Sequence, residues 1–309
     1  MSDNYSREAL TKRTMPFMTL STAENPLTAP ITRRIDADVG RSPAEIAQRR
    51  FTVTGNAIVT GGAGSLGLEG ARALLEHGAS GVALFDRDAS FSSDNARREI
   101  VALREVFQDR KVLEMVVDVT DEQVVQQRVE ESVQAFGDAG VQMLLCFAGV
   151  VDTVDAEDVK AAQFRRVLDV NTTGSWICAQ AVGKQMIKQK TGGSIVFTAS
   201  ISAHHVNFPQ PQVAYNVSKG ALLQLKSSLG AEWAKYGIRV NSISPGYCDT
   251  ILNEGPGLAT ARDIWTSRNP MGRMADPSEL AGTVVLLCSP AGKYINAADI
   301  IVDGGGNVF

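Results

Sequence analysis

Short apolar runs alternate with longer amphipathic stretches from residue 51 to the end of the chain. The apolar runs predict seven strands, at residues 57–60, 81–85, 112–117, 142–147, 194–198, 239–243 and 299–302. Strands that alternate with helices in this way are typical of a parallel sheet covered on both faces. The pattern therefore predicts an α/β fold with a doubly wound sheet of seven parallel strands, flanked by helices on both faces.

Residues that commonly cap helices precede several of the amphipathic stretches. These capping residues predict helices over 95–107, 121–136 and 278–288. The stretch 155–190 is too long for one uncapped helix and contains two β-branched threonines followed by Gly174, so we expect two helices there. Because we see no internal repeat and no second core, residues 51–309 are predicted to form a single domain.

The first 50 residues have a different composition. They contain only one of the 28 glycines, Gly40, but four of the 11 prolines, and they show no sustained apolar period. A polar tract rich in Ser, Thr and Pro buries too little surface to offset the entropy lost on ordering. Residues 1–50 are therefore predicted to be an extension that is either flexible or draped over the domain.

Net charge and hydrophobic content narrow the class of protein. The formal charge is −4, with 44% hydrophobic and 21% charged residues, which is the balance of a globular protein. The chain lacks the basic excess that attracts nucleic acid or anionic lipid. Its apolar runs fall short of the roughly 20 residues of a membrane-spanning helix. We expect a cytoplasmic protein whose partner is a small molecule, with neither nucleic acid nor membrane involved.

The cysteines and histidines do not form a metal-binding pattern. The four cysteines contain no Cys-x-x-Cys pair, and two of the three histidines, His204 and His205, are adjacent. Neighbouring side chains on an extended segment point to opposite faces, so these two histidines are poorly placed to share one ion. We therefore expect no metal site, and free thiols in a reducing compartment.

A glycine-rich turn follows the first predicted strand directly. Gly62, Gly64 and Gly67 have the spacing G-x-G-x-x-G, and a helical stretch comes next. Taken alone, such a cluster is equally typical of a tight turn. At the start of a helix, however, glycines let a pyrophosphate approach the backbone N–H groups, which side chains would block. The strand, turn and helix in this order predict a Rossmann-type dinucleotide site on Gly61, Gly62, Gly64, Ser65, Leu66 and Gly67.

An acidic residue ends the second predicted strand. Asp86 lies 19 residues after Gly67. A carboxylate at this place accepts hydrogen bonds from both ribose hydroxyls of NAD and repels the 2′-phosphate of NADP. Arg87 follows and offers a guanidinium to such a phosphate, so the sequence favours NAD and leaves NADP open. Asp118 and Val119, after the third strand, are candidates for the adenine pocket, although Asp118 equally fits a simple cap before the next helix.

A tyrosine and a lysine four residues apart, Tyr215 and Lys219, begin another helical run. The spacing places both side chains on one face of the helix. A nearby fixed cation stabilises phenolate and lowers the pKa of a tyrosine towards neutrality, as a general acid and base for a carbonyl or alcohol requires. The pair by itself is common and mostly structural, so its meaning depends on the rest of the chain.

Together with the glycine turn, this pair makes residues 51–309 resemble the short-chain dehydrogenase/reductase family, in its single-domain branch. Further segments agree in order: Ala148-Gly149, Asn171 in Asp-Val-Asn-Thr-Thr-Gly, the stretch from Pro245 to Thr250, and the closing Val302-Asp303-Gly304-Gly305. The resemblance implies one dinucleotide-binding and catalytic domain and a homotetramer or homodimer. It also implies cofactor contacts from Ala148, Gly149, Asn171, Tyr215, Lys219, Pro245, Gly246 and Thr250.

The sequence departs from the family pattern at three places. Ser65 stands at the middle glycine of the family's motif, and Cys146-Phe147 replaces its Asn-Asn pair. The family's catalytic serine lies 13 residues before the tyrosine, which is the position of Ser202, whereas Ser200 lies 15 before. We expect Ser200 to be catalytic because it ends the fifth strand, and loops accept insertions more readily than strand ends do. Ser202 stays the alternative.

The resemblance implies hydride transfer between a nicotinamide cofactor and a carbonyl carbon. The catalytic set is then Asn171, Ser200, Tyr215 and Lys219. Tyr215 exchanges a proton with the substrate oxygen, and Ser200 donates a hydrogen bond to it. Lys219 lowers the pKa of the tyrosine and holds the nicotinamide ribose, while Asn171 supports a water chain to the lysine.

Polar side chains near the serine indicate the kind of substrate. The candidates are Ser202, His205, Asn207, Gln210 and Tyr247. Amide, imidazole and hydroxyl groups suit a hydroxyl-rich ligand, and this region is similar to fungal polyol dehydrogenases and ketose reductases. We therefore expect an NAD(P)-dependent enzyme that interconverts a secondary alcohol and a ketone of a polyol or ketose. Two alternatives are a ketone reductase of secondary metabolism with a more apolar substrate and a non-catalytic dinucleotide sensor.

Overall fold

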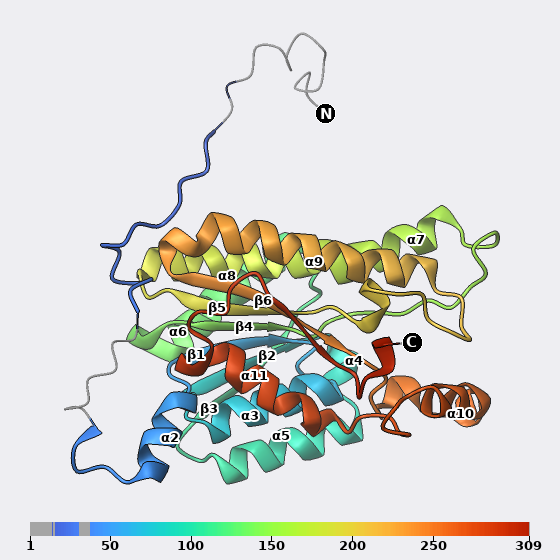
Figure 1. The fold of residues 1–309 in the computed structure, drawn as a ribbon, viewed down its shortest axis with the longest axis horizontal. Helices are drawn as coiled ribbons and strands as arrows, with labels where there is room; N and C mark the ends of the chain where they lie inside the picture. The colour runs from blue at the N-terminus through green and yellow to red at the C-terminus, as the bar shows by residue number, and fades with distance from the viewer. Residues whose placement is uncertain (1–13, 15, 31–37, 309) are drawn as a thin grey trace.

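Seven parallel strands form one sheet in the order β3-β2-β1-β4-β5-β6-β7 (Figure 1). The computed structural model describes residues 14, 16–30 and 38–308. The strands are β1 (Asn56–Thr60), β2 (Gly81–Asp86), β3 (Lys111–Val116), β4 (Met143–Cys146), β5 (Gly193–Thr198), β6 (Ile238–Pro245) and β7 (Asp299–Val302). Each predicted strand is present, with ends that differ by at most two residues. The predicted doubly wound fold is confirmed.

Helices cover both faces of this sheet (Figure 1). One face carries α3 (Ser65–Glu76), α5 (Asp94–Val106) and α11 (Ala281–Cys288), and the other carries α6 (Glu122–Phe136), α8 (Ser175–Gln189) and α9 (Val213–Trp233). Shorter helices are α2 (Pro43–Phe51), α4 (Asp88–Phe91), α7 (Ala161–Leu168) and α10 (Ala259–Ser267). In the described ranges, the helices are too short or too polar to cross a membrane.

The central strands are apolar throughout because both of their faces are buried. Val59 and Leu145 pack into the core under α3 and α11, while their neighbours Ile58 and Leu144 pack into the core under α8 and α9. Successive strand residues point to opposite faces, so a strand covered on both sides reads as a continuous apolar run. This explains why simple apolar runs located the strands correctly.

Successive strands are added on one side of β1 up to β3 and on its other side from β4 onward, so the strand order reverses between β1 and β4. β1 pairs with both β2 and β4, and Thr60 at its carboxyl end lies opposite Phe85 on one side and Cys146 on the other. Helices that follow strands on the two sides of such a switch point leave towards opposite faces of the sheet, and a crevice opens between them. Ligands of open α/β sheets bind in that crevice, which directs attention to the loops after β1, β2 and β4.

The stretch 155–190 contains the two predicted helices, α7 and α8, and a π-helical segment joins them. This segment, η4 (Asp169–Gly174), leaves no break between the helices. A Cβ atom on Gly174 would lie 2.7 Å from a methyl group of Val119, so only glycine fits there. π-helical segments inside helices often occur at functional sites, and this one carries Asn171.

Part of the predicted N-terminal extension lies against the domain. The Asn25 side chain donates a hydrogen bond to the carbonyl of Lys235 (2.8 Å), and Lys235 Nζ donates to Thr19 Oγ1 (2.8 Å). The extension also contains all of α2 except its last residue, and a Ser42–Glu45 capping box initiates this helix. Residues 1–13, 15 and 31–37 of the extension lie outside the described residues. The domain boundary after residue 50 stays a prediction.

Candidate active site

A cleft of about 910 Å³ opens at the switch point of the sheet. It runs from the loops after β2 and β3, across the glycine turn, to the loop after β4. Twelve of the predicted cofactor residues line it: Gly61, Gly64, Ser65, Leu66, Gly67, Asp86, Arg87, Asp118, Val119, Ala148, Gly149 and Thr250. The structure therefore brings together segments that are widely separated in the chain.

The glycines of the turn are required by close backbone packing. A Cβ atom on Gly67 would lie 2.1 Å from the carbonyl oxygen of Gly61, which is far inside contact distance. Gly61 itself has a φ of +66°, and its Cβ would lie 2.7 Å from the Ala148 nitrogen. Gly62 packs beneath the turn, where a Cβ would meet the Val59 carbonyl oxygen at 2.7 Å. Gly62 thus shapes the cleft without lining it.

The start of α3 offers unpaired backbone donors to the cleft. The helix begins at Ser65 with Gly64 at the N-cap, and within the described chain no side chain caps it. The first N–H groups of a helix have no partners inside the helix, and the helix dipole adds positive potential there. Side-chain-free backbone and unpaired N–H groups fit a pyrophosphate. Ser65, in place of the family's glycine, is the first residue of α3 and lines the cleft.

Two carboxylates line the cleft beyond the turn. Asp86 accepts hydrogen bonds from the backbone nitrogens of Ala63 (3.1 Å) and Arg87 (2.8 Å), which hold it at the end of β2. Asp118 accepts from the backbone nitrogen and hydroxyl of Thr120 (2.9 and 2.7 Å). These two bonds, with smaller contributions from the Arg87 and Arg166 charges, lower the pKa of Asp118. Asp118 is therefore both a turn-capping residue and a cleft residue.

Asn171 ties the loop after β4 to the first turn of α9. Its Oδ1 accepts from the Val150 nitrogen (2.8 Å), and its Nδ2 donates to the Val150 carbonyl (2.9 Å) and to Ser218 Oγ (2.9 Å). Ser218 Oγ in turn donates to the carbonyl of Tyr215 (2.7 Å). The Asn171 side chain is completely buried. The π-helical segment thus holds the helical turn that carries the tyrosine and the lysine.

Lys219 lies behind the end of the cleft. Its amine donates to the carbonyl of Thr198 (2.6 Å) at the end of β5 and lies 5.6 Å from the centre of the Tyr215 ring. A Cβ atom on Gly149, which lines the cleft, would lie 3.3 Å from Asn171 Oδ1 and 3.7 Å from Lys219 Nζ. Burial lowers the pKa of Lys219 to about 8. Asn171 and Lys219 therefore lie directly behind the wall of the cleft.

The phenol of Tyr215 has a raised pKa, not the lowered one that the sequence led us to expect. Burial raises this pKa to about 12, and a hydrogen bond with Ser200 opposes the rise. The physical reason is that Lys219 is itself desolvated and bound to Thr198, so its charge does not offset the burial of the phenol. Tyr215 is consequently in its protonated form at neutral pH, ready to give a proton.

Of the two candidate serines, Ser200 is the one that contacts Tyr215. The Ser200 hydroxyl donates to Ser202 Oγ (3.0 Å) and accepts from the Ser202 nitrogen (3.1 Å). Ser202 also accepts from Gln212 Nε2 (3.3 Å). Ser202 therefore lies one hydrogen bond further from the phenol.

We expect Ser200→Ala to lower kcat by about 100-fold or more, because it removes the hydrogen-bond donor next to the reacting oxygen. Ser202→Ala should lower kcat by no more than about tenfold, since a neutral hydrogen bond to Ser200 contributes little more than that. Steady-state kinetics of the two variants with saturating cofactor measure the difference. A larger loss for Ser202→Ala would reverse the assignment.

Two of the predicted substrate residues, Asn207 and Gln210, donate to the phenol of a third, Tyr247. Tyr247 accepts hydrogen bonds from Asn207 Nδ2 and Gln210 Nε2, both at 2.9 Å. Its ring stacks on Trp265, with centroids 4.2 Å apart and planes 8° from parallel. Trp265 is almost fully buried. Asn207, Gln210, Tyr247 and Trp265 therefore form an aromatic and amide wall, close enough to Tyr215 for Tyr247 to influence its pKa.

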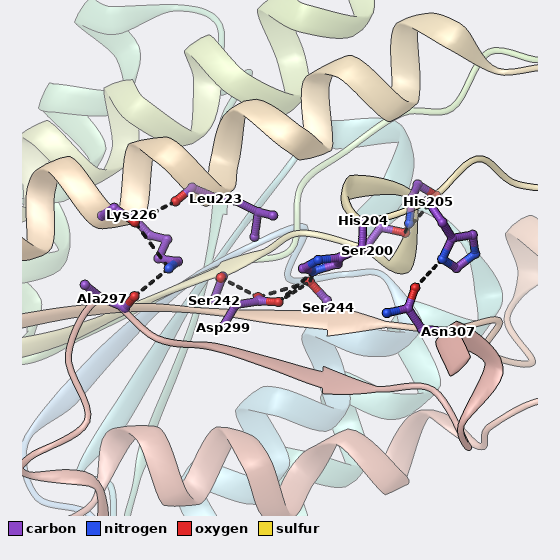
Figure 2. Close-up of polar contacts among 12 residues, drawn as sticks. Ser200, His204, His205, Leu223, Lys226, Ser242, Ser244, Ala297, Asp299 and Asn307 are labelled. Atoms are coloured by element: carbon purple, nitrogen blue, oxygen red, sulfur yellow. Dashed lines mark hydrogen bonds and ion pairs between the residues drawn. The ribbon is translucent and has the colours of Figure 1, made fainter. Parts of the chain in front are cut away.

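The histidine pair has other partners (Figure 2). His204 Nε2 lies 2.9 Å from Asp299 Oδ2 and 3.2 Å from Ser244 Oγ, beneath the loop that carries Ser200. His205, which the sequence placed at the substrate, is hydrogen-bonded through Nδ1 to Asn307. The prediction for His205 is not supported by this geometry, because its ring is directed to the C-terminal segment.

Some cleft residues were not predicted, and some predicted ones do not line it. Arg166 enters from α7, and Ser90, Ser93 and Asn95 enter from α4 and the start of α5, regions that no motif marked. Others adjoin predicted residues or flank Asn171 in its motif, and were readable as their neighbours: Ala63, Phe85, Val117, Thr120, Phe147, Val150, Asp169, Val170, Thr173 and Ile251. Asn171, Tyr215, Lys219, Pro245 and Gly246 lie outside the lining set. Gly246 instead lets the chain after β7 approach, since its Cβ would meet Asp303 at 2.8 Å.

Known proteins are similar to this chain in sequence and in fold. A family model described as Enoyl-(Acyl carrier protein) reductase matches residues 61–307. The chain is 36% identical to the NADP-dependent mannitol dehydrogenase of Hypocrea jecorina, over 82% of this chain and 93% of that protein. It is 37% identical to the galactitol 2-dehydrogenase of Rhizobium johnstonii, over 84% and 97%.

Solved structures agree with the sequence relatives. A short-chain type dehydrogenase/reductase from Mycobacterium marinum has 33% identity and a TM-score of 0.74, covering 83% of this chain and 97% of that one. A gluconate 5-dehydrogenase from Burkholderia cenocepacia, in complex with NADP and tartrate, has 28% identity and a TM-score of 0.75, covering 85% and 99%. The chain belongs to the short-chain dehydrogenase/reductase family.

Proposed function

We propose that the protein is an NAD(P)-dependent oxidoreductase that interconverts a secondary alcohol and a ketone, with a polyol or ketose as substrate. The proposal rests on one arrangement: Tyr215, Ser200, Lys219 and Asn171 lie together behind the end of a cleft that fits a dinucleotide. A sensor would need only the cleft. The complete set of proton-handling groups at its end supports an enzyme.

The residues have separate tasks in this reaction. The bound nicotinamide supplies or accepts the hydride. Tyr215 gives its proton to the carbonyl oxygen during reduction and takes the hydroxyl proton during oxidation. Ser200 turns its O–H from Ser202 Oγ to the same oxygen and donates a hydrogen bond to it as charge develops there. Lys219 and Asn171 fix the position of the turn of α9 that carries Tyr215 relative to the wall of the cleft.

The polyol assignment is supported by the relatives and by the wall beside Tyr215. The curated relatives named above are dehydrogenases of mannitol and galactitol. The side chains Asn207, Gln210 and Tyr247 supply amide and hydroxyl groups to a substrate with several hydroxyls. Initial rates of reduced-nicotinamide formation or loss, with a panel of polyols, ketoses and apolar ketones, test the proposal. Faster turnover of the apolar ketones would favour the alternative reductase.

We propose NAD as the preferred cofactor, because the Asp86 carboxylate lies in the cleft at the end of β2. Two observations favour NADP as the alternative. Arg87 and Arg166 also line the cleft, and a relative and a solved neighbour are named with NADP. Comparison of kcat/KM for NAD and NADP in the wild-type enzyme decides between them, and a ratio at or below one would reject the NAD preference.

Replacement of Asp86 should change this preference. Asp86→Asn removes the negative charge but keeps an oxygen for the Ala63 nitrogen. We expect the ratio of kcat/KM for NAD over NADP to fall by about 10- to 100-fold, because the repulsion of a 2′-phosphate is relieved. Asp88→Asn removes the same charge from an exposed position two residues later and serves as control. Equal shifts in both variants would contradict a specific role for Asp86.

A further inference from the structure

Tyr247 follows β6, and its phenol oxygen is a double acceptor. Asn207 Nδ2 and Gln210 Nε2 each donate to it from 2.9 Å. A phenol oxygen carries a single proton, and two amide donors use its acceptor capacity. The O–H bond of Tyr247 therefore points away from both amides.

The direction of these amides is fixed by their other partners. The Trp265 indole N–H, which can only donate, gives its hydrogen bond to Gln210 Oε1 (3.0 Å). Gln210 consequently presents its NH2 group to Tyr247. Asn207 is held in the same sense, because its Oδ1 accepts from Gln212 Nε2 (2.9 Å). Stacking on Trp265 fixes the plane of the Tyr247 ring.

This phenol lies beside the catalytic one. β5 and β6 are adjacent and parallel, with Thr198 opposite Ile243, so Ser200 and Tyr247 leave the same edge of the sheet. The nearby Tyr247 contributes to the raised pKa of Tyr215. Tyr247 is only partly buried, so its O–H can reach a molecule bound at Tyr215.

We propose that Tyr247 is a dedicated hydrogen-bond donor to a second oxygen of the substrate, and that it selects ketones with a hydroxyl group beside the carbonyl. The inference rests on the proposed function and names the residue that recognises this feature of its substrate class. A substrate with hydrogen in place of that hydroxyl leaves the O–H of Tyr247 unpaired in a partly desolvated site. Sites built around such a polar group reject analogues that lack its partner.

The test combines one variant with matched substrates. Tyr247→Phe is assayed with the 2-ketose that the wild-type enzyme reduces best and with its 1-deoxy and 3-deoxy analogues, which lack one flanking hydroxyl each. We expect kcat/KM for the ketose to fall by about 10- to 100-fold. For one of the two deoxy analogues, kcat/KM of Tyr247→Phe should differ from the wild-type value by less than about threefold, because that analogue lacks the hydroxyl that Tyr247 contacts.

A second variant keeps the phenol and redirects its proton. Gln210→Glu replaces the NH2 donor with a carboxylate oxygen, which accepts the O–H of Tyr247 in a charge-assisted hydrogen bond. As in Tyr247→Phe, the ratio of kcat/KM for the ketose over that for this deoxy analogue should fall towards one. Tyr294→Phe, which removes a phenol oxygen from a fully exposed ring, is the matched control and should leave both rates unchanged.

The outcomes separate the inference from the function beneath it. If the wild-type enzyme turns over no polyol or ketose, both the inference on Tyr247 and the proposed function are overturned. A wild-type enzyme active on the ketose, with Tyr247→Phe slowing the ketose and both deoxy analogues equally, overturns the inference alone, since that is the result of a structural role. The Tm of Tyr247→Phe should fall modestly, because Asn207 and Gln210 lose their shared acceptor. Dinucleotide titration by fluorescence should give the wild-type affinity, and a large change in that affinity would count against a substrate contact.

Discussion

Tyr215→Phe should lower kcat by about 100- to 10,000-fold in both directions, the range that a positioned general acid or base contributes. The variant loses only the phenol oxygen, which exchanges the proton with the substrate. Its dinucleotide affinity should stay within about threefold of wild type, because the cradle of glycines and the start of α3 bind independently of this oxygen. Stopped assays for turnover and fluorescence titration for the dinucleotide measure the two quantities.

The control for this variant lies at the other end of α9. Tyr236 follows the C-terminus of that helix and contacts Lys235 through its ring. Tyr236→Phe removes an equal phenol oxygen and should keep normal turnover. Retention of more than a tenth of wild-type kcat in Tyr215→Phe would remove the tyrosine from the proposed mechanism.

The raised pKa of Tyr215 also sets the sign of the pH dependence. With a pKa of about 12, the phenol is protonated throughout the neutral range. Reduction uses this protonated form directly, whereas in oxidation the group must accept the hydroxyl proton of the substrate, which only the phenolate can do. Oxidation should accelerate from about pH 6 to 9 while reduction does not. Lys219, with a pKa of about 8, loses its charge in the upper part of that range.

The sheet was predictable because its physical signal is local. β1, β2 and β4 are buried on both faces, so each is an apolar run in the sequence itself. The glycine turn was predictable for a similar reason, since strand, glycines and helix are contiguous. α2 was missed although its Ser42–Glu45 capping box is equally local, because its exposed faces gave no apolar period.

Features that depend on tertiary packing were beyond the sequence. Spacing placed Tyr215 and Lys219 on one helix face correctly, but the sign of the pKa shift depends on burial of both groups. Likewise, Asn207, Gln210 and Tyr247 were individually suggested as substrate residues, yet nothing in the sequence indicated that two amides converge on one phenol. His205 fits the same polar pattern and turns to Asn307 instead.

Gly67→Ala should damage both stability and dinucleotide binding. The new Cβ would lie 2.1 Å from the Gly61 carbonyl oxygen. The atoms that it meets belong to the backbone of the turn, so the turn itself must move. Overpacking of this kind destabilises a protein by about 1–3 kcal/mol, and a drop in Tm measured by differential scanning fluorimetry reports it. Because the displaced turn supplies the N–H groups of the cradle, dinucleotide affinity should fall by at least about tenfold.

Two other glycines separate these effects. Gly282 is exposed on α11. Apart from its chain neighbours and the backbone of its own helix, no atom of the described chain lies within 4 Å of its Cβ position, so Gly282→Ala should stabilise the helix by about 0.5–1 kcal/mol. Gly64 lines the cleft, and its nearest neighbour, the Gly61 oxygen, lies at 3.3 Å. Gly64→Ala should therefore keep most of the stability. A Gly67→Ala protein with wild-type Tm and affinity would show that the turn is not the rigid cradle that dinucleotide binding at this sheet edge requires.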